Sequence, residues 1–118
     1  IGTVGGYLLL FNSQFQAIHQ FHHCKEDIDD VKYSGNGENL AVASHDNFID
    51  LYGTKPKYKH HFRLRGHTSY VTHIDWSTNN LFVQSNCGAY EILYWDVRRG
   101  CQVYHFACKL FRKHLMRP

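Results

Sequence analysis

The chain repeats itself at a spacing of just over forty residues, and this repeat limits the folds that it can adopt. IDDVKYS (28–34) and VTHIDWS (71–77) share the pattern apolar, any, any, apolar, any, aromatic, Ser, at an offset of 43. LAVAS (40–44) lies 41 residues before LFVQS (81–85), and FIDLY (48–52) lies 43 before EILYW (91–95). Matched segments in a constant order indicate duplicated structural units.

Each unit is predicted to contain four short β-strands. From Val71 onward Thr72, Ile74 and Trp76 point to one side while Val71, His73 and Asp75 point to the other, which is the period of a strand. Turn-forming residues separate the strands, which we predict at 28–33, 39–44, 48–52 and 58–64 in one unit and 71–77, 81–86, 91–97 and 101–107 in the next.

Four short strands recurring every ~40–45 residues is the period of a β-propeller blade. GTVGGYLLLF (2–11) lies 41 residues before ASHDNFIDLY (43–52) and matches it in length without a gap, so part of an earlier unit precedes the other two. We therefore predict an all-β chain of about two and a half four-stranded antiparallel blades. The expected boundaries are the end of a first blade at 1–22, a second blade at 23–65, a third at 66–107 and a basic, divergent tail at 108–118.

The composition narrows the class of protein and its compartment. The longest strongly apolar run, YLLLF (7–11), is far shorter than the ~20 residues of a membrane-spanning helix, so we expect no membrane partner. With a net charge of only +3 we also expect no nucleic acid. The four cysteines form no CxxC pair, which favours free thiols in the cytosol. We expect the chain to be a piece of a longer soluble protein.

Ten histidines beside four cysteines raise the question of a metal site. The densest groupings are 22–24, 60–61 and the pair Cys101 and Cys108. Structural zinc prefers two pairs of closely spaced ligands, and neighbouring residues of a strand face opposite ways. We therefore predict no metal and no cofactor.

The ends of the third unit resemble those of a WD repeat, with Gly66-His67 before the first strand and Trp95-Asp96 closing the third. In that family the His ring reaches a Ser or Thr on the second strand and, through an Asp of the next turn, the aromatic residue on the third. The resemblance assigns His67, Ser85 and Trp95 to this structural network. The Asp place is expected to be empty, because the turn at 87–90 is longer by two residues.

The middle unit carries the complementary set. Ser44, Asp46 and Tyr52 match the network, but Cys24 stands where the His belongs. Neither blade is thus expected to hold the full network. A buried network of this kind satisfies polar groups and stabilises a blade, so His67 and Ser85 are expected to be structural and no enzyme is predicted.

Longer phrases resemble the echinoderm microtubule-associated protein-like family over residues 1 to about 108. They are FHHCKEDIDDVKYS (21–34), LAVASHDNFIDLY (40–52), GHTSYVTHIDWS (66–77) and SNCGAYEILYWDV (85–97). The resemblance implies a non-catalytic scaffold segment of a microtubule-associated protein, with tubulin or microtubules as partner, in the cytoplasm at the cytoskeleton. The alternative is a general WD-repeat adaptor for another protein complex.

On a WD propeller, the loops before the first strand and between the second and third strands share one face. We predict that this face meets a protein partner, since exposed aromatic and charged groups suit such a surface. The alternative is that these loops are merely solvated. The candidate contact residues are Lys25, Glu26, His45, Asn47, Tyr70 and Tyr90.

Two further expectations concern the ends of the chain. The basic residues of the tail at 108–118 could bind an acidic surface, although an alternative or disordered chain end is the simpler interpretation. An unclosed propeller exposes strand edges, so we predict that this chain alone is unstable or self-associating.

Overall fold

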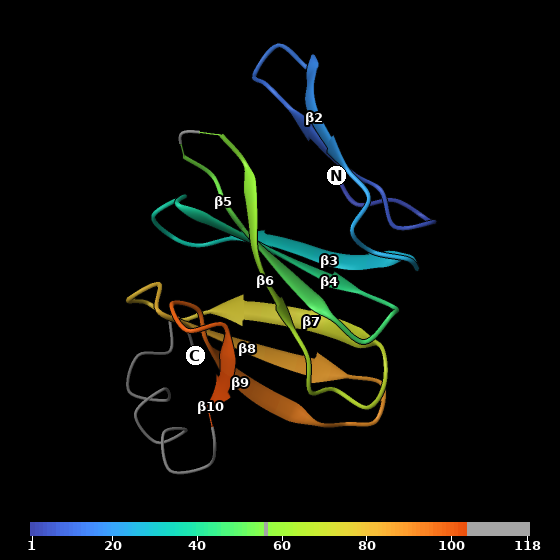
Figure 1. The fold of residues 1–118 in the computed structure, drawn as a ribbon, viewed down its shortest axis with the longest axis vertical. Coiled ribbons are helices and arrows are strands. Elements are labelled where there is room, and N and C mark those ends of the chain that lie inside the picture. The colour runs from blue at the N-terminus through green and yellow to red at the C-terminus, as the bar shows by residue number, and fades with distance from the viewer. Residues whose placement is uncertain (56, 104–118) are drawn as a thin grey trace.

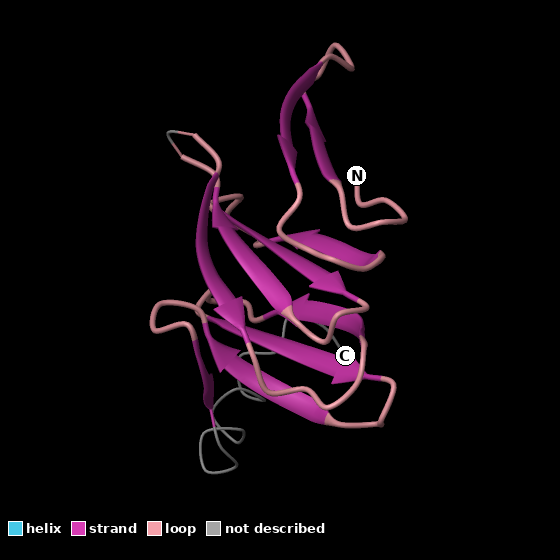
Figure 2. Ribbon diagram, turned by 45° about the vertical axis from the view of Figure 1, so that its right-hand side comes forward, coloured by secondary structure: helices cyan, strands magenta, loops and turns pink. Residues whose placement is uncertain are grey.

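The computed structural model describes residues 1–55 and 57–103, and the regular elements in these residues are all strands (Figure 2). The described part of the chain contains no helix that could cross a membrane. The tail at 108–118 and the end of the last predicted strand lie outside the described residues. The strands are β1 (Leu8–Phe11), β2 (Ala17–Phe21), β3 (Ile28–Tyr33), β4 (Asn39–Ser44), β5 (Ile49–Gly53), β6 (Lys59–Leu64), β7 (Val71–Trp76), β8 (Phe82–Cys87), β9 (Ile92–Asp96) and β10 (Cys101–Val103).

The strands form three antiparallel sheets in which neighbours in sequence are neighbours in space. The first sheet is the pair β1-β2, the second is β3-β4-β5-β6 and the third is β10-β9-β8-β7. Figure 1 shows them stacked in chain order, with the blue hairpin at one end and the yellow and orange sheet at the other. The predicted fold class, partial propeller blades of four antiparallel strands, is confirmed.

The repeat is visible atom by atom in the turns that follow β3 and β7. Ser34 Oγ donates to Asn36 Oδ1 at 2.7 Å, and Ser77 Oγ donates to Asn79 Oδ1 at 2.6 Å. Both serine oxygens also accept a backbone N–H at the start of the next strand, each at 3.1 Å. The matching turn sequences therefore fold alike because a buried serine and an asparagine satisfy the same backbone groups.

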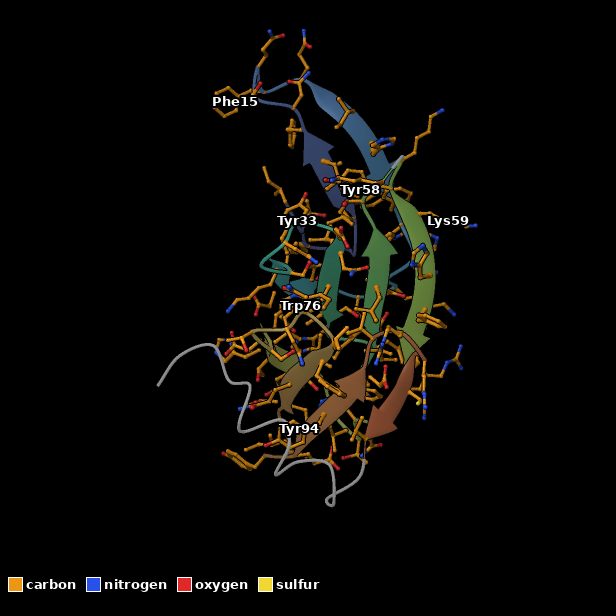
Figure 3. All side chains as sticks on the ribbon, turned by 90° about the vertical axis from the view of Figure 1, so that its left-hand side faces the viewer. Phe15, Tyr33, Tyr58, Lys59, Trp76 and Tyr94 are labelled. Carbon is orange, nitrogen blue, oxygen red and sulfur yellow. The ribbon has the colours of Figure 1, made fainter. Side chains whose placement is uncertain are left out.

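Strand β4 is buried on both faces because a sheet covers each side of it. Leu40 and Val42 join the core shared with the first sheet, and Ala41 and Ala43 join the core shared with the third. The alternation of a strand thus serves two cores at once. The third sheet contributes Trp76 to the second of these cores, where Figure 3 shows it between the two larger sheets.

Hydrogen bonds also join the second and third sheets. Trp76 Nε1 donates to the carbonyl oxygen of Lys32 at 3.0 Å, and the backbone N–H of Ile74 donates to Asp30 Oδ2 at 3.1 Å.

The sequence expectation that Val71 points away from Ile74 and Trp76 is wrong, because this side chain is fully buried beside them. A shift in register between Val71 and His73 turns Val71 to the core face.

Candidate functional site

A buried network links His67, in the loop before β7, to Ser85 of β8 and Trp95 of β9. His67 Nε2 lies 2.6 Å from Ser85 Oγ, and Trp95 Nε1 donates to the same oxygen at 2.7 Å. The structure therefore brings His67, Ser85 and Trp95 together, with Ser85 itself joining the two rings. In the family pattern an acid links the His to the aromatic residue, whereas here Ser85 Oγ contacts both rings directly.

An acid nevertheless belongs to this network, on the other side of the His67 ring. His67 Nδ1 lies 3.5 Å from Glu91 Oε1, which accepts hydrogen bonds from the backbone N–H of Thr68 at 3.0 Å and from Cys87 Sγ at 3.2 Å. The Thr68 N–H, together with the Cys87 thiol, lowers the pKa of Glu91 to about 2. Burial lowers the pKa of His67 and outweighs the opposing effect of Glu91, so the ring is neutral at neutral pH.

The prediction that the acid place is empty in the third sheet is thus wrong. In the second sheet Asp46 Oδ2 accepts the backbone N–H of Lys25 at 3.0 Å. Lys25 and Thr68 are equivalent positions at the repeat offset of 43, so Asp46 and Glu91 perform the same task. The connection from the serine to the aromatic residue is longer by two residues in the third sheet, so the acid comes later in the sequence than Asp46 does in its own unit. The side chain of Glu91 is one methylene longer than that of Asp46, which lets its carboxylate reach the equivalent position.

In the second sheet the predicted residues Ser44, Asp46 and Tyr52 do not form one network. Ser44 Oγ donates to Asp46 Oδ1, whereas the hydroxyl of Tyr52 lies 2.8 Å from His23 Nδ1. Tyr52 is buried, which raises its pKa well above the ordinary value and keeps the hydroxyl protonated. The structure thus brings Ser44 and Asp46 together but directs Tyr52 to a histidine.

Asp50 is a site residue that sequence reasoning missed. Its carboxylate is fully buried and contacts His60 Nε2 at 2.7 Å, Arg63 Nε at 3.0 Å and Cys24 Sγ at 3.3 Å. Burial, followed by the charge of Asp50, raises the pKa of Cys24 to about 12. The thiol that stands in the His place is therefore a protonated donor and no nucleophile. An acid at an inward strand position opposite an arginine is the signal that could have revealed this cluster.

The loops predicted to share one face do contact one another in the structure. We call this the loop face: residues 24–27 and 45–48 of the second sheet with 65–70 and 88–90 of the third. The rings of His45 and Tyr70 stack at 4.1 Å across the boundary between the sheets, and His45 Nδ1 lies 2.8 Å from Asp29 Oδ2. Lys25 and Glu26 are exposed beside them, and Asn47 takes a positive φ of 74° in the β4–β5 turn.

A pocket of about 410 Å³ opens on the loop face of the third sheet. Tyr90, 96% exposed, stands at its margin, and Tyr70, 39% exposed, packs against Gly88. A side chain at Gly88 would collide with the Tyr70 ring, so the glycine is needed for this close approach. The remaining lining residues are Thr72, Asn86, Cys87 and Ile92.

Two of the histidine and cysteine groups weighed in the sequence meet at Asp50, which contacts both Cys24 and His60. His22 Nε2 meets Gly5 O, His23 meets Tyr52 and Cys24 meets Asp50. His61 packs over Gly53 while its neighbour contacts Asp50. A different group, His67, Cys87 and Glu91, places three potential ligand atoms within 4.8 Å of one another.

Comparisons with known proteins agree with the fold. A family model for the second β-propeller of the echinoderm microtubule-associated protein matches residues 1–111. The human echinoderm microtubule-associated protein-like 4 is 42% identical over 107 residues, covering 87% of this chain and 11% of that protein. The 77 kDa echinoderm microtubule-associated protein of Lytechinus variegatus is 51% identical over 82 residues, covering 67% and 12%. The chain thus spans about an eighth of the length of these relatives.

Proposed function

Because the chain belongs to the echinoderm microtubule-associated protein family, we propose that it is a non-catalytic scaffold segment of a microtubule-associated protein and contributes propeller blades to a protein-binding surface. Its partner is tubulin or the microtubule, and its location is the cytoplasmic cytoskeleton. The observation that carries the proposal is the loop face, where the exposed Tyr70 stacks on His45 and Tyr90 lies beside it at the pocket. Membership of this family favours it over a general WD-repeat adaptor.

The tyrosines of the loop face are suited to anchoring a protein partner. Tyrosine offers a large contact area with few rotatable bonds and a polar tip, and such residues dominate binding energy at interfaces. Tyr70 is held by His45 on one side and lies close to Gly88, so little further ordering is required on binding. Tyr90 is nearly fully exposed at the pocket margin and gains the most from being covered.

The charged residues of the same face divide into paired and exposed groups. Asp27 accepts the backbone N–H of Gly5 at 2.9 Å, and Asp29 pairs with His45. Lys25 and Glu26 are exposed and form a charged rim beside the tyrosines. Rim charges of this kind influence the rate and salt dependence of association more than the final affinity.

The buried networks support the non-catalytic part of the proposal. Ser85 is fully buried, and its Oγ lies against the His67 and Trp95 rings, so a substrate cannot approach it. Cys24 is also buried and has a raised pKa. Ser85 with His67, and Cys24, are the residues that could suggest nucleophilic catalysis, and both sets are therefore parts of buried networks that hold the blades together.

Co-sedimentation with microtubules tests the proposal directly. The chain is spun alone and with microtubules at low and moderate salt, together with the variants Tyr70→Ala and Tyr90→Ala. Each variant should pellet less than the parent, because it removes an exposed aromatic contact. Ile18→Ala is the control, since Ile18 is 47% exposed in β2 and belongs neither to the loop face nor to the lining of the apolar hollow beside β1.

Pelleting that survives moderate salt and falls in the two tyrosine variants alone supports a tubulin contact on the loop face. Loss of pelleting in moderate salt would assign binding to charge instead. A chain that stays in the supernatant refutes a tubulin contact on these blades. Equal pelleting of all variants would show that the tyrosines of the loop face do not contribute to microtubule binding.

Self-association of the isolated chain remains a prediction. Strand β2 lies at an edge of its sheet, and an apolar hollow of about 350 Å³ beside its partner β1 is lined by residues that include Leu9, Phe11 and Phe15. Unpaired strand edges next to apolar surface favour pairing between chains. Sedimentation velocity should show a coefficient that rises with concentration, and a constant monomer value would refute the prediction.

A further inference from the structure

We propose that His67, Cys87 and Glu91 form a binding site for a zinc ion at the loop face of the third sheet. These residues come from the loop before β7, the end of β8 and the residue before β9, and their ligand atoms lie within 4.8 Å of one another. The donor set is one imidazole nitrogen, one thiol sulfur and one carboxylate oxygen. Zinc accepts all three kinds of ligand.

The distances suit a tetrahedral ion. With zinc bonds of about 2.0–2.3 Å, two ligand atoms of a tetrahedron are separated by about 3.3–3.8 Å. His67 Nδ1 lies 3.5 Å from Glu91 Oε1, and Cys87 Sγ lies 3.2 Å from the same oxygen. Small movements of side chains would therefore seat the ion.

A second, independent observation is the unsatisfied nitrogen of His67. Nδ1 is buried and has no hydrogen-bond partner of ordinary length, because the nearest acceptor, Glu91 Oε1, lies 3.5 Å away. It faces the thiol and the carboxylate, so a metal ion would supply the missing partner. The His67 side chain is only 1% exposed, which makes it a rigid ligand.

The residues behind the site already hold the imidazole as a metal ligand requires. His67 Nε2 lies 2.6 Å from Ser85 Oγ, and Trp95 Nε1 donates to the same oxygen. With its proton on Nε2, His67 donates to Ser85 and presents the Nδ1 lone pair to the ion. Such contacts behind a ligand orient it and strengthen metal binding.

Charge and access complete the case. Zinc replaces the proton of the Cys87 thiol, which is released to solvent, and the thiolate with the Glu91 carboxylate then neutralises the two positive charges of the ion. Cys87 lines the pocket beside Tyr70 and Tyr90, so the ion has an entry path from the loop face. Three protein ligands leave one position for water or for a group of a partner.

Cobalt(II) is the spectroscopic probe for zinc in the first experiment. The 118-residue chain should take up one Co²⁺ per molecule, with a thiolate-to-cobalt charge-transfer band and visible bands of a four-coordinate site, and Zn²⁺ should displace it. Cys87→Ser should lose the charge-transfer band. Cys101→Ser, which alters an exposed cysteine outside the group, should retain it. Circular dichroism checks that each variant is folded.

A measurement on the unaltered chain keeps the proposal falsifiable if Cys87→Ser does not fold. Zinc should slow alkylation of Cys87 at least about tenfold, while Cys101 reacts at an unchanged rate. Absence of stoichiometric metal, a charge-transfer band that survives Cys87→Ser, or alkylation of Cys87 that ignores zinc each overturns the proposal. Microtubules are absent from both assays, so failure of the tubulin contact does not affect the result.

Discussion

Replacing Ser85 by alanine should destabilise the chain more than an ordinary surface change, because one oxygen serves two buried rings. Ser85 is fully buried, Trp95 is 1% exposed and His67 is 7% exposed, so water cannot replace the lost hydroxyl. The substitution leaves Trp95 Nε1 without its acceptor at 2.7 Å and His67 Nε2 without its partner at 2.6 Å. A buried unsatisfied polar group costs about 1–3 kcal/mol, so the expected loss is about 2–4 kcal/mol.

Urea unfolding followed by circular dichroism measures this loss, at a concentration where sedimentation shows one species. The midpoint should fall with an unchanged slope, and the melting temperature should drop by roughly 4 °C for each kcal/mol. Ser13→Ala is the control, since Ser13 is exposed in the β1–β2 turn. If Ser85→Ala matches the Ser13→Ala control within ~0.5 kcal/mol, the shared-oxygen argument is refuted.

Three further predictions use the same unfolding assay. Asp50→Asn removes the counter-charge of a partly exposed arginine in β6 and should cost about 3 kcal/mol, and a loss below ~1 kcal/mol would contradict a structural ion pair there. Gly100→Ala should lower the free energy of unfolding more than Gly37→Ala. Both glycines have a positive φ, but of the two only Gly100 lies against a side chain of β6, so equal losses would refute that contact. Burial lowers the pKa values of His67 and His23 below 6.5, so the unfolded chain binds more protons just below that pH. Stability should therefore be full above pH 6.5 and fall as the pH drops further, and a midpoint that is flat from about pH 7.5 to 5.5 would count against buried neutral rings.

The strand pattern could be predicted from the sequence because repeat, turn chemistry and alternation all indicated the same elements. Strands β3 and β4 have the predicted bounds. The expectation failed at Val71, where a register shift adds a residue and reverses the alternation. Such a shift depends on the partner strand, and a single strand sequence does not reveal it.

The candidate site could be predicted only where a motif names its residues. His67, Ser85 and Trp95 follow a known pattern, whereas Glu91 was missed because the turn before it is longer and the acid has a different length. Asp50 was missed because a buried charge is recognisable only when its partner on the next strand is known. Contacts across sheets, such as the stack of His45 on Tyr70, depend on how the blades pack against one another.

The double burial of β4 also has a consequence for how the chain folds. A strand whose two sides belong to two different cores gains little when only one neighbouring sheet is in place. Formation of the middle sheet is therefore tied to both neighbours, so unfolding in solution should be cooperative along the stack. Backbone amides at the centre of β4 would exchange with deuterium only when the neighbouring sheets separate, and they should be the slowest of the described strands.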